Sequence, residues 1–197
     1  MARRSFVLMA TFVAALLLAG AAIAARVTVR VEGKTQSIFG SKPVTVDATN
    51  ALQALDIAST LGEFYYGITH SSFGDYVSQV GKYGGAGNAG WVFKVNGFSP
   101  PVGADQVQLK DGDTVLWYYA TFSATGGPPT LDLKALTGNC YSVTSYDDAG
   151  KASPAAGAVI HVDGRRVKVV DGKGCVGAHK GLLRAFSFGT VRSNSAK

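Results

Sequence analysis

Long apolar runs are missing from most of this sequence. Ser5 to Ala25 is the exception: it contains no charged residue, follows Arg3 and Arg4, and ends in the small residues Ala22 to Ala24. A positive start, an apolar stretch and a small-residue cleavage site are typical of a secretory signal peptide. We therefore predict that residues 1–24 are a signal peptide and that the protein is secreted or held at the cell surface. An uncleaved membrane anchor stays open as the alternative, because about 20 apolar residues can span a bilayer.

Cysteine is scarce: the chain has two, Cys140 and Cys175. A zinc site needs three or four ligands at close spacing, and within four residues of either cysteine the sequence offers no second cysteine and only one histidine, His179. An even number of cysteines in an oxidising compartment instead predicts a disulfide. We expect Cys140 and Cys175 to form it, and we expect no metal site.

Charged residues make up only 16% of the chain, and the charged runs typical of exposed helices are absent. Valine, threonine, tyrosine and phenylalanine dominate the patterned stretches, which favours strands. The charge is also uneven: residues 25–127 carry seven basic and eight acidic groups, whereas residues 128–197 carry ten and five, a net charge of +5. Arg165, Arg166 and Lys168 have no aromatic residues between them, so we interpret them as a solvated face and expect no nucleic-acid partner.

One segment, Ser123 to Pro129, has the composition of a linker, with small residues followed by a proline pair. It predicts two domains, at residues 25–122 and 130–197. In the first, Val27 to Val31 alternates and a second extended run reaches Val46, which indicates a hairpin. A helix then follows through Thr60, with Asp47 or Thr49 as the N-cap and Gly62 as the stop.

We predict mainly strands for the rest of the first domain. Phe64 to Thr69, Tyr76 to Val80 and Trp91 to Val95 are extended, a mobile glycine-rich loop fills Gly81 to Gly90, and Val107 to Leu109 forms a hairpin with Thr114 to Tyr119. Two strands, one helix and further strands predict an α+β domain of the β-grasp type, a sheet curled around a single helix. The second domain has short alternating strands and repeated Asp-Gly turns, which predict an antiparallel β-sandwich.

Several motifs that suggest catalysis lack the context they need. Gly85 to Gly90 matches GxGxxG but precedes a strand, whereas dinucleotide binding needs a helix after the glycines. Asp111-Gly112-Asp113 lacks the further ligands of a calcium loop. We interpret His70, His161 and His179 as unpaired surface residues, because no nucleophile elbow accompanies them. We expect no catalytic residues, no enzyme activity and no cofactor.

Aromatic residues crowd into the first domain. On strands, alternate residues share a face, so Trp91 lies with Phe93 and Trp117 with Tyr119. Ordinary core packing accounts for part of this set, and the surplus can form a platform for a flat or amphipathic ligand. The candidate ligand-binding residues are Tyr65, Tyr66, Tyr76, Trp91, Phe93, Trp117 and Tyr119.

Three stretches also resemble a known family. Val44 to Leu55, GWVFKVNG at residues 90–97 and VGADQVQLKDGDTVLWYY at residues 102–119 are similar to the transcobalamin-like C-terminal domain. The resemblance covers about Arg26 to Phe122 and implies a β-grasp unit of an exported protein. Because the helical partner domain of the cobalamin carriers is missing, it implies no cobalamin-binding residue here. PAAGAVIHVDGRRVKVVDGKGCV, at residues 154–176, resembles carboxypeptidase-regulatory or bacterial immunoglobulin-like modules, which serve as spacers or adhesion units.

These observations predict a secreted, non-enzymatic binding module for a small flat or amphipathic ligand or a cell-surface partner. After cleavage of the signal it would have no membrane contact. The alternative is a structural or adhesion protein displayed at the cell surface.

Overall fold

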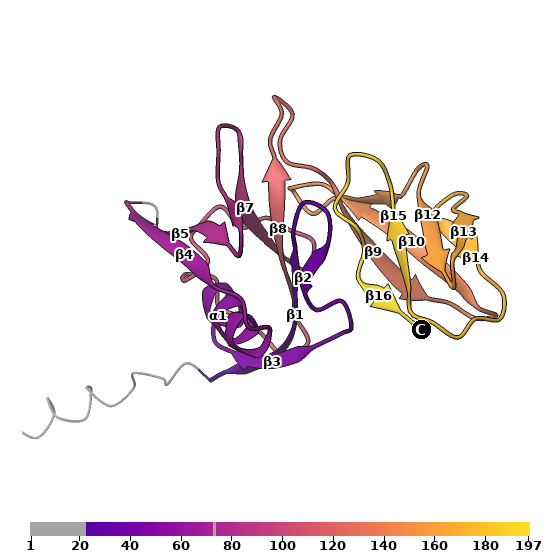
Figure 1. Ribbon diagram of the computed structural model, residues 1–197, viewed down its shortest axis with the longest axis horizontal. Helices are drawn as coiled ribbons and strands as arrows, with labels where there is room; N and C mark the ends of the chain where they lie inside the picture. Colours follow the sequence, from indigo (N-terminus) through magenta and orange to yellow (C-terminus); the bar gives the residue numbers. More distant parts are fainter. Residues whose placement is uncertain (1–22, 73) are drawn as a thin grey trace, which may run out of the picture.

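The computed structural model describes residues 23–72 and 74–197. Nearly all of the predicted signal peptide therefore lies outside the described residues. Within them the chain forms one helix and sixteen strands, with helix and strands mixed in the first half and strands alone in the second (Figure 1). We call residues 25–122 the N-terminal unit and residues 130–197 the C-terminal unit. The chain is thus α+β and mostly β.

A five-stranded sheet forms the centre of the N-terminal unit. Its strands are β1 (Ala25–Glu32), β2 (Ser37–Phe39), β3 (Thr45–Ala48), β7 (Ala89–Val95) and β8 (Thr114–Thr121). The order is β2-β1-β8-β7, and β3 also pairs with β1. The β1–β8 pair is parallel and the other pairs are antiparallel. The predicted opening hairpin is present, although the second extended run is divided into β2 and β3.

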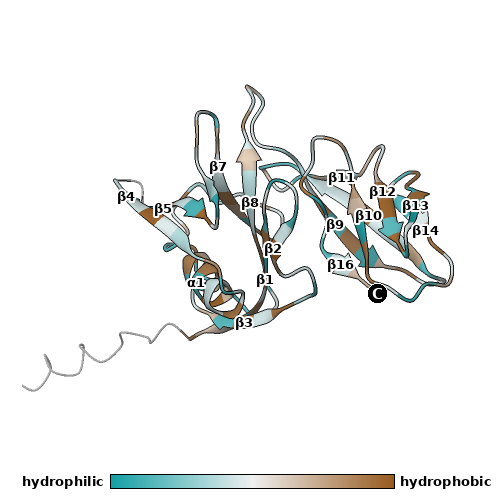
Figure 2. Ribbon diagram, in the orientation of Figure 1, coloured by the Kyte–Doolittle hydropathy of each residue, from teal (hydrophilic) through white to brown (hydrophobic). Residues whose placement is uncertain are grey.

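The single helix, α1 (Ala51–Leu61), covers one face of this sheet. Its buried residues Ala54, Leu55 and Ala58 pack against Val27 and Val29 of β1, because alternate residues of a strand share one face. The apolar side of α1 is visible in Figure 2. As predicted, the helix ends at Gly62, which is the C-cap.

The N-cap differs from the prediction. Asn50 caps the helix, and its side-chain oxygen accepts a hydrogen bond from the Gln53 backbone N–H at 2.8 Å. Asparagine is among the best N-cap residues, since its short side chain reaches the free N–H groups of the first turn. Thr49 instead bonds the side chain of Gln53, with its backbone N–H donating to Oε1 at 2.6 Å.

A small sheet of β4 (Tyr66–Ser71), β5 (Gly74–Val80) and β6 (Tyr83–Gly84) lies beside the central sheet. Two predictions differ from the structure here. The loop expected at Gly81 to Gly90 contains β6 and a tight turn in which Ala86 and Ala89 exchange backbone hydrogen bonds. Val107 to Leu109 forms no hairpin with β8, because β1 and β7 occupy both edges of β8.

The C-terminal unit consists of two four-stranded sheets that share an apolar core. One contains β9 (Thr130–Ala135), β10 (Cys140–Tyr146), β11 (Ala152–Pro154) and β14 (Lys173–Cys175). The other contains β12 (Val159–Val162), β13 (Arg165–Lys168), β15 (Leu183–Phe186) and β16 (Ser195–Ala196). Inward residues of both, among them Val143 and Ile160, form one cluster. The arrangement is sandwich-like, as the alternating strands and Asp-Gly turns predicted.

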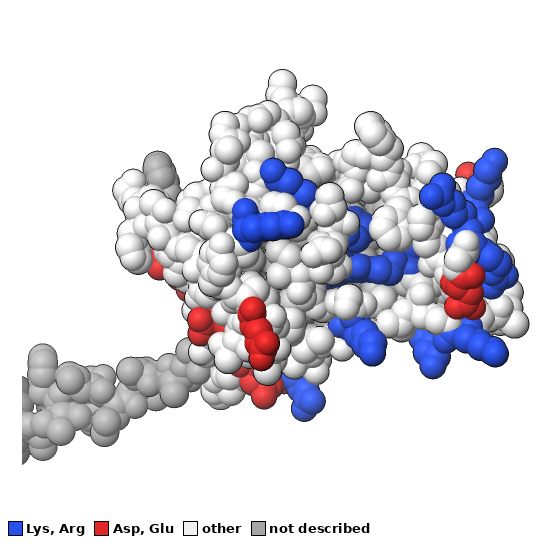
Figure 3. All heavy atoms as spheres, viewed as in Figure 1, with Lys and Arg blue, Asp and Glu red and all other residues white. Residues whose placement is uncertain are grey.

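Blue basic side chains gather on the C-terminal unit in Figure 3. Arg165, Arg166 and Lys168 of β13 are all exposed. Their exposure agrees with the predicted solvated face. No membrane-spanning helix, judged by length and apolar character, occurs among the residues that the structure describes.

The predicted disulfide is present. Cys140 opens β10 and pairs directly with Cys175, which closes β14, and their sulfur atoms are bonded. The bridge joins residues 35 positions apart and therefore restricts the unfolded chain.

Replacing both cysteines, in Cys140→Ser with Cys175→Ser, is expected to lower the free energy of unfolding by about 4 kcal/mol, because the loop-closure restriction of the unfolded state is lost. Urea unfolding of the C-terminal unit, followed by circular dichroism, measures it. A double variant as stable as the parent chain would contradict this expectation.

The second face of the central sheet is covered by the C-terminal unit. Leu116, Tyr118 and Ala120 of β8 form a small apolar cluster there with Val191. Beside it lies Glu32, whose side chain is 1% exposed although it is charged. Both faces of β1 and β8 are therefore buried, one by the helix and one by the C-terminal unit.

Three arginines surround the Glu32 carboxylate. Arg30 Nη1 lies 3.0 Å from Oε1, Arg184 Nη2 2.5 Å from Oε1, and Arg192 Nε 3.1 Å from Oε2. Ser37 Oγ donates to the same carboxylate at 2.9 Å. Burial lowers the pKa of Arg30 and of Arg192, and the Glu32 charge opposes this change. Because Arg184 and Arg192 belong to the C-terminal unit, this charge cluster joins the two units.

Lys94 makes a second polar connection between the units. Its ammonium group donates to the carbonyl oxygens of Tyr146 and Asp147 at 3.1 and 2.8 Å, and lies 3.4 Å from Asp148 Oδ1. Burial lowers the pKa of Lys94, while the Asp148 carboxylate acts in the opposite direction. The side chain is buried on the outer face of β7, and its ammonium group is surrounded by oxygen atoms of the C-terminal unit.

Removing the Glu32 charge, in Glu32→Gln, is expected to destabilise the protein by about 3 kcal/mol, because three arginines are left in a buried site without their counterion. Urea unfolding measures the loss. The control is Asp132→Asn, which removes the carboxylate of the partly exposed Lys134–Asp132 pair at 3.9 Å and should cost less than about 1 kcal/mol. Equal losses in the two variants would argue against a structural role for Glu32.

Candidate ligand-binding groove

Two of the cavities that the described residues line are nearly equal in size. One, of about 500 Å³, is a cleft between the two units. The other, of about 490 Å³, is an apolar hollow on the N-terminal unit, which we call the aromatic groove. The aromatic groove is lined by Thr69, Ser71, Gly74–Val77, Trp91–Phe93, Ser99–Ala104, Trp117, Tyr118, Phe122 and Asp148.

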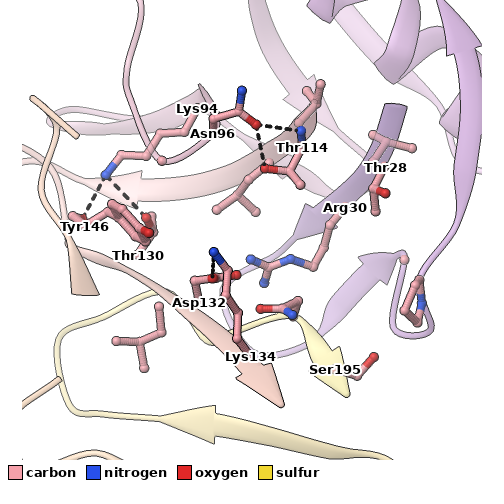
Figure 4. Close-up of a pocket in the computed structure, with 18 of the residues that line it drawn as sticks. Thr28, Arg30, Lys94, Asn96, Thr114, Thr130, Asp132, Lys134, Tyr146 and Ser195 are labelled. Atoms are coloured by element: carbon pink, nitrogen blue, oxygen red, sulfur yellow. Dashed lines mark hydrogen bonds and ion pairs between the residues drawn. The ribbon is translucent and has the colours of Figure 1, made fainter. Parts of the chain in front are cut away.

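The polar side chains of the interdomain cleft mainly bond one another. In Figure 4, Lys94 points to Thr130 and Tyr146, and Asn96 accepts from the backbone N–H and the hydroxyl of Thr114. Arg30 is held by Glu32 and by the Arg192 carbonyl oxygen at 2.7 Å. These groups hold the units together, so we take the aromatic groove as the candidate site.

Strands β7 and β8 supply the floor of the aromatic groove. Their register places Phe93 opposite Trp117, and the two rings stack with centroids 5.0 Å apart. Trp91 is 1% exposed and Trp117 2% exposed. The indole N–H of Trp91 donates to the Tyr83 carbonyl oxygen at 2.7 Å, and that of Trp117 to the Ala51 carbonyl oxygen at 3.2 Å. Both indoles are thus fixed in orientation, as a preformed site requires.

Strand β5 and the loop at Ser99 to Ala104 supply the walls. Tyr76 lies in β5 and is 44% exposed, and Val77 beside it is buried. The loop contributes Pro100, Pro101 and Val102 and is bonded at both ends, since Ser99 N–H donates to the Asp148 carbonyl at 3.0 Å and Leu52 N–H to the Ala104 carbonyl at 3.1 Å. The wall is therefore held in place rather than free to collapse into the groove.

Close backbone contact joins the hairpin of β4 and β5 to this loop. A Cβ added at Gly103 would lie 3.2 Å from the Gly74 Cα and 2.4 Å from Asp105 Oδ1. Only a residue without a side chain fits there without displacement. Glycine at position 103 therefore lets the loop at Ser99 to Ala104 contact the Gly74 end of β5.

Two carboxylates stand at the rim, and both have partners. Asp75 Oδ1 lies 2.6 Å from His70 Nδ1. Asp148 Oδ2 accepts from the Gly127 N–H at 2.8 Å, and Oδ1 lies near Lys94. Burial raises the pKa of Tyr118, and the negative charge of Asp148 raises it further. The Tyr118 hydroxyl is therefore neutral at physiological pH. The groove therefore offers mainly apolar contacts.

Four of the seven predicted ligand-binding residues line the aromatic groove: Tyr76, Trp91, Phe93 and Trp117. The other three are not lining residues. Tyr66 donates its hydroxyl to Asp56 of the helix at 3.0 Å, and burial together with this bond raises its pKa to about 12. Tyr65 is 62% exposed and accepts from Gln79, whereas Tyr119 packs against Trp91 and donates to the Gly84 carbonyl oxygen.

Sequence reasoning missed the wall at Pro100 to Val102, as well as Phe122. The signal was present in the proline pair of FSPPV, which cannot join a ladder and therefore presents apolar rings from a loop. Which strand the loop would face depends on the tertiary fold.

The prediction of unpaired surface histidines is wrong in detail. His70 pairs with Asp75, and His179 Nε2 lies 2.9 Å from the Tyr141 hydroxyl. His161 packs on Phe186 with ring centroids 4.5 Å apart. Burial lowers the pKa of His161, and the positive charge of Arg166 lowers it further. Within residues 23–72 and 74–197, no three histidine, cysteine or acidic side chains are grouped so as to hold a metal ion.

Comparison with known proteins finds a family model that is similar to the groove-bearing segment. A family model described as a domain of unknown function, DUF4430, matches residues 47–121. This segment contains the lining residues of the aromatic groove except Phe122 and Asp148. No curated protein matches the chain.

Among solved structures, one similar chain is a "putative metal binding protein" from Ruminococcus gnavus ATCC 29149. It shares 17% sequence identity with this chain at a TM-score of 0.39, over 50% of this chain and 99% of that chain.

Proposed function

We propose that this protein is an extracytoplasmic, non-enzymatic binding module that takes a flat or amphipathic ligand in the aromatic groove. The N-terminal unit would be a β-grasp domain of the transcobalamin-like kind, and export would follow from the signal at residues 1–24. The observation that carries the proposal is that four aromatic residues line one cavity: Trp91, Trp117, Phe93 and Tyr76. These include both tryptophans of the chain.

The size and chemistry of the groove support this proposal. Ligand sites commonly occupy 300–1,000 Å³ and are lined by apolar and aromatic side chains with few polar groups, and the aromatic groove, at about 490 Å³, lies within that range. Aromatic faces favour flat apolar partners. The carboxylates Asp75 and Asp148 leave the rim polar, which suits an amphipathic ligand.

The C-terminal unit supports the groove in this proposal instead of acting as a free spacer. Asp148 extends from it to the groove rim, and Arg184 and Arg192 bind Glu32 on the outer face of the central sheet. A rigid support is consistent with a binding site whose walls come from several elements.

Truncating Tyr76, in Tyr76→Ala, is expected to weaken the binding of an apolar probe about 5- to 10-fold, because an aromatic contact and its buried area are lost. The probes are anilinonaphthalene sulfonate and cobalamin, each titrated against tryptophan emission. Both tryptophans lie in the groove floor, so their emission reports on this site.

The matched control is Tyr65→Ala, another exposed tyrosine of the same unit that lies outside the groove. It should bind both probes as the parent does. Equal weakening in the two variants, or probe binding that leaves tryptophan emission unchanged, would place the binding elsewhere and contradict the proposal.

A further inference from the structure

Strand β7 is an edge strand of the central sheet. Within the described residues its ladder partner is β8, and no strand pairs with its other side. An open edge presents backbone N–H and C=O groups that can pair with another chain. This open edge faces the aromatic groove, which Trp91, Val92 and Phe93 line.

The register shows which backbone groups of β7 are free. The Asn88 carbonyl oxygen accepts from Phe122 N–H at 2.8 Å, and Asn96 N–H donates to the Thr114 carbonyl oxygen at 3.0 Å. In an antiparallel ladder, hydrogen-bonded residues alternate with non-bonded ones. Even-numbered residues of β7 therefore bond to β8, and the backbone groups of odd-numbered residues point to the open edge.

Both ends of this edge are closed by the chain itself. Ala89 exchanges two backbone hydrogen bonds with Ala86, at 2.9 and 3.0 Å, and Val95 exchanges two with Phe98, also at 2.9 and 3.0 Å. Between these turns lie Trp91 and Phe93. Their two N–H and two C=O groups have no hydrogen-bond partner among the described residues, and a backbone group that is shielded from water usually has one.

The opposite wall also has an unfilled edge. On its side toward β6, strand β5 bonds only through Ser78, Gln79 and Val80, so the stretch from Gly74 to Val77 has no ladder partner there among the described residues. Strand β6 leads through the Ala86–Ala89 turn directly into β7, and thus this side of β5 faces β7.

The shape of the groove also fits a strand. It is lined by Trp117 from the inner face of the central sheet and by Tyr118 from the outer face, so the hollow extends around both sides of the β7 edge. A single flat ring would occupy one side only. An added strand places alternate side chains on opposite sides and fills both.

We propose that the ligand of the aromatic groove is an extended apolar peptide segment that pairs with the β7 edge at Trp91 and Phe93 as an additional strand. This inference rests on the proposed function, because it names the chemical class of the ligand that the groove takes. Backbone pairing supplies the register, and the aromatic and proline walls select apolar side chains at alternate positions.

The test uses the full chain and blocked heptapeptides that carry valine, leucine or phenylalanine at alternate positions with threonine between them. Binding is measured by calorimetry and by tryptophan emission. Each binding peptide is then compared with two versions N-methylated on one or the other set of alternate amides. The version that cannot donate to β7 should bind at least about tenfold more weakly, because two backbone hydrogen bonds are lost.

Three outcomes would overturn the inference. N-methylated peptides that bind as tightly as their parents would show recognition by side chains alone. A chain that dimerises through this edge, seen by light scattering without peptide, would make a second copy the occupant. Failure of every peptide while anilinonaphthalene sulfonate or cobalamin still binds would leave the proposed function standing, whereas failure of all probes would end both.

Amide hydrogen exchange gives an independent readout that needs no variant. Bound peptide should slow the exchange of the Trp91 and Phe93 amides about tenfold or more, since these gain a partner. The Val92 amide, which already faces β8, serves as the internal control and should change little. Unchanged exchange at Trp91 and Phe93 in the saturated complex would contradict strand pairing.

A protein variant tests the same bond from the other side. Phe93→Pro removes the outward N–H, whereas Phe93→Ala removes the same ring and keeps the N–H. Proline should weaken peptide binding about threefold or more beyond alanine, and the two should bind anilinonaphthalene sulfonate alike. Equal peptide affinities would count against the inference, and if the proline variant does not fold, the N-methylated peptides decide.

Discussion

The Glu32 carboxylate with its three arginines is the interaction on which the arrangement of the whole chain depends. It lies on the outer face of β1, a position that would be solvent-exposed if the N-terminal unit stood alone. Arg184 and Arg192 from the C-terminal unit enclose it, and the desolvation of four charges is tolerable only because they satisfy one another. The central sheet is therefore buried on both faces, and the two units act as one body.

This constraint explains why the groove takes its form. With the outer face of β8 covered and the inner face packed on α1, the edge at β7 is the part of the central sheet that borders the aromatic groove. Lys94 and Asp148 fix the outer side of that edge, and the stacked Phe93 and Trp117 fix the inner side. The binding surface is thus an edge with two sides, which differs from the flat platform that the aromatic residues alone suggest.

A family model for a domain of unknown function matches residues 47–121, which include most of the groove. The chemistry of the groove therefore has to be argued from its contacts. The carboxylates Asp75 and Asp148 at the rim are bonded to other parts of the chain, whereas the backbone N–H and C=O groups of Trp91 and Phe93 have no partner among the described residues. Backbone atoms in an apolar setting favour a partner that brings its own backbone.

Local chemistry in the sequence determined much of the structure. Alternation gave β1, β7 and β8, the 3.6-residue period and Gly62 gave the helix, and Asn96-Gly97 and the Asp-Gly pairs gave turns with positive φ. The two cysteines could be paired by elimination. The strands, the helix and the turns depend on residues that are close in the chain, and the disulfide follows because the chain has only two cysteines.

Only the tertiary structure decided which surfaces meet. The parallel pairing of β1 with β8 joins segments more than eighty residues apart, and it displaced the hairpin expected at Val107 to Leu109. Glu32 reads as an ordinary turn residue until Arg184 and Arg192 lie beside it, and Tyr65, Tyr66 and Tyr119 could not be separated from Tyr76 by pattern. Periodicity reports which side of a strand a residue occupies; the packing of distant elements decides what that side faces.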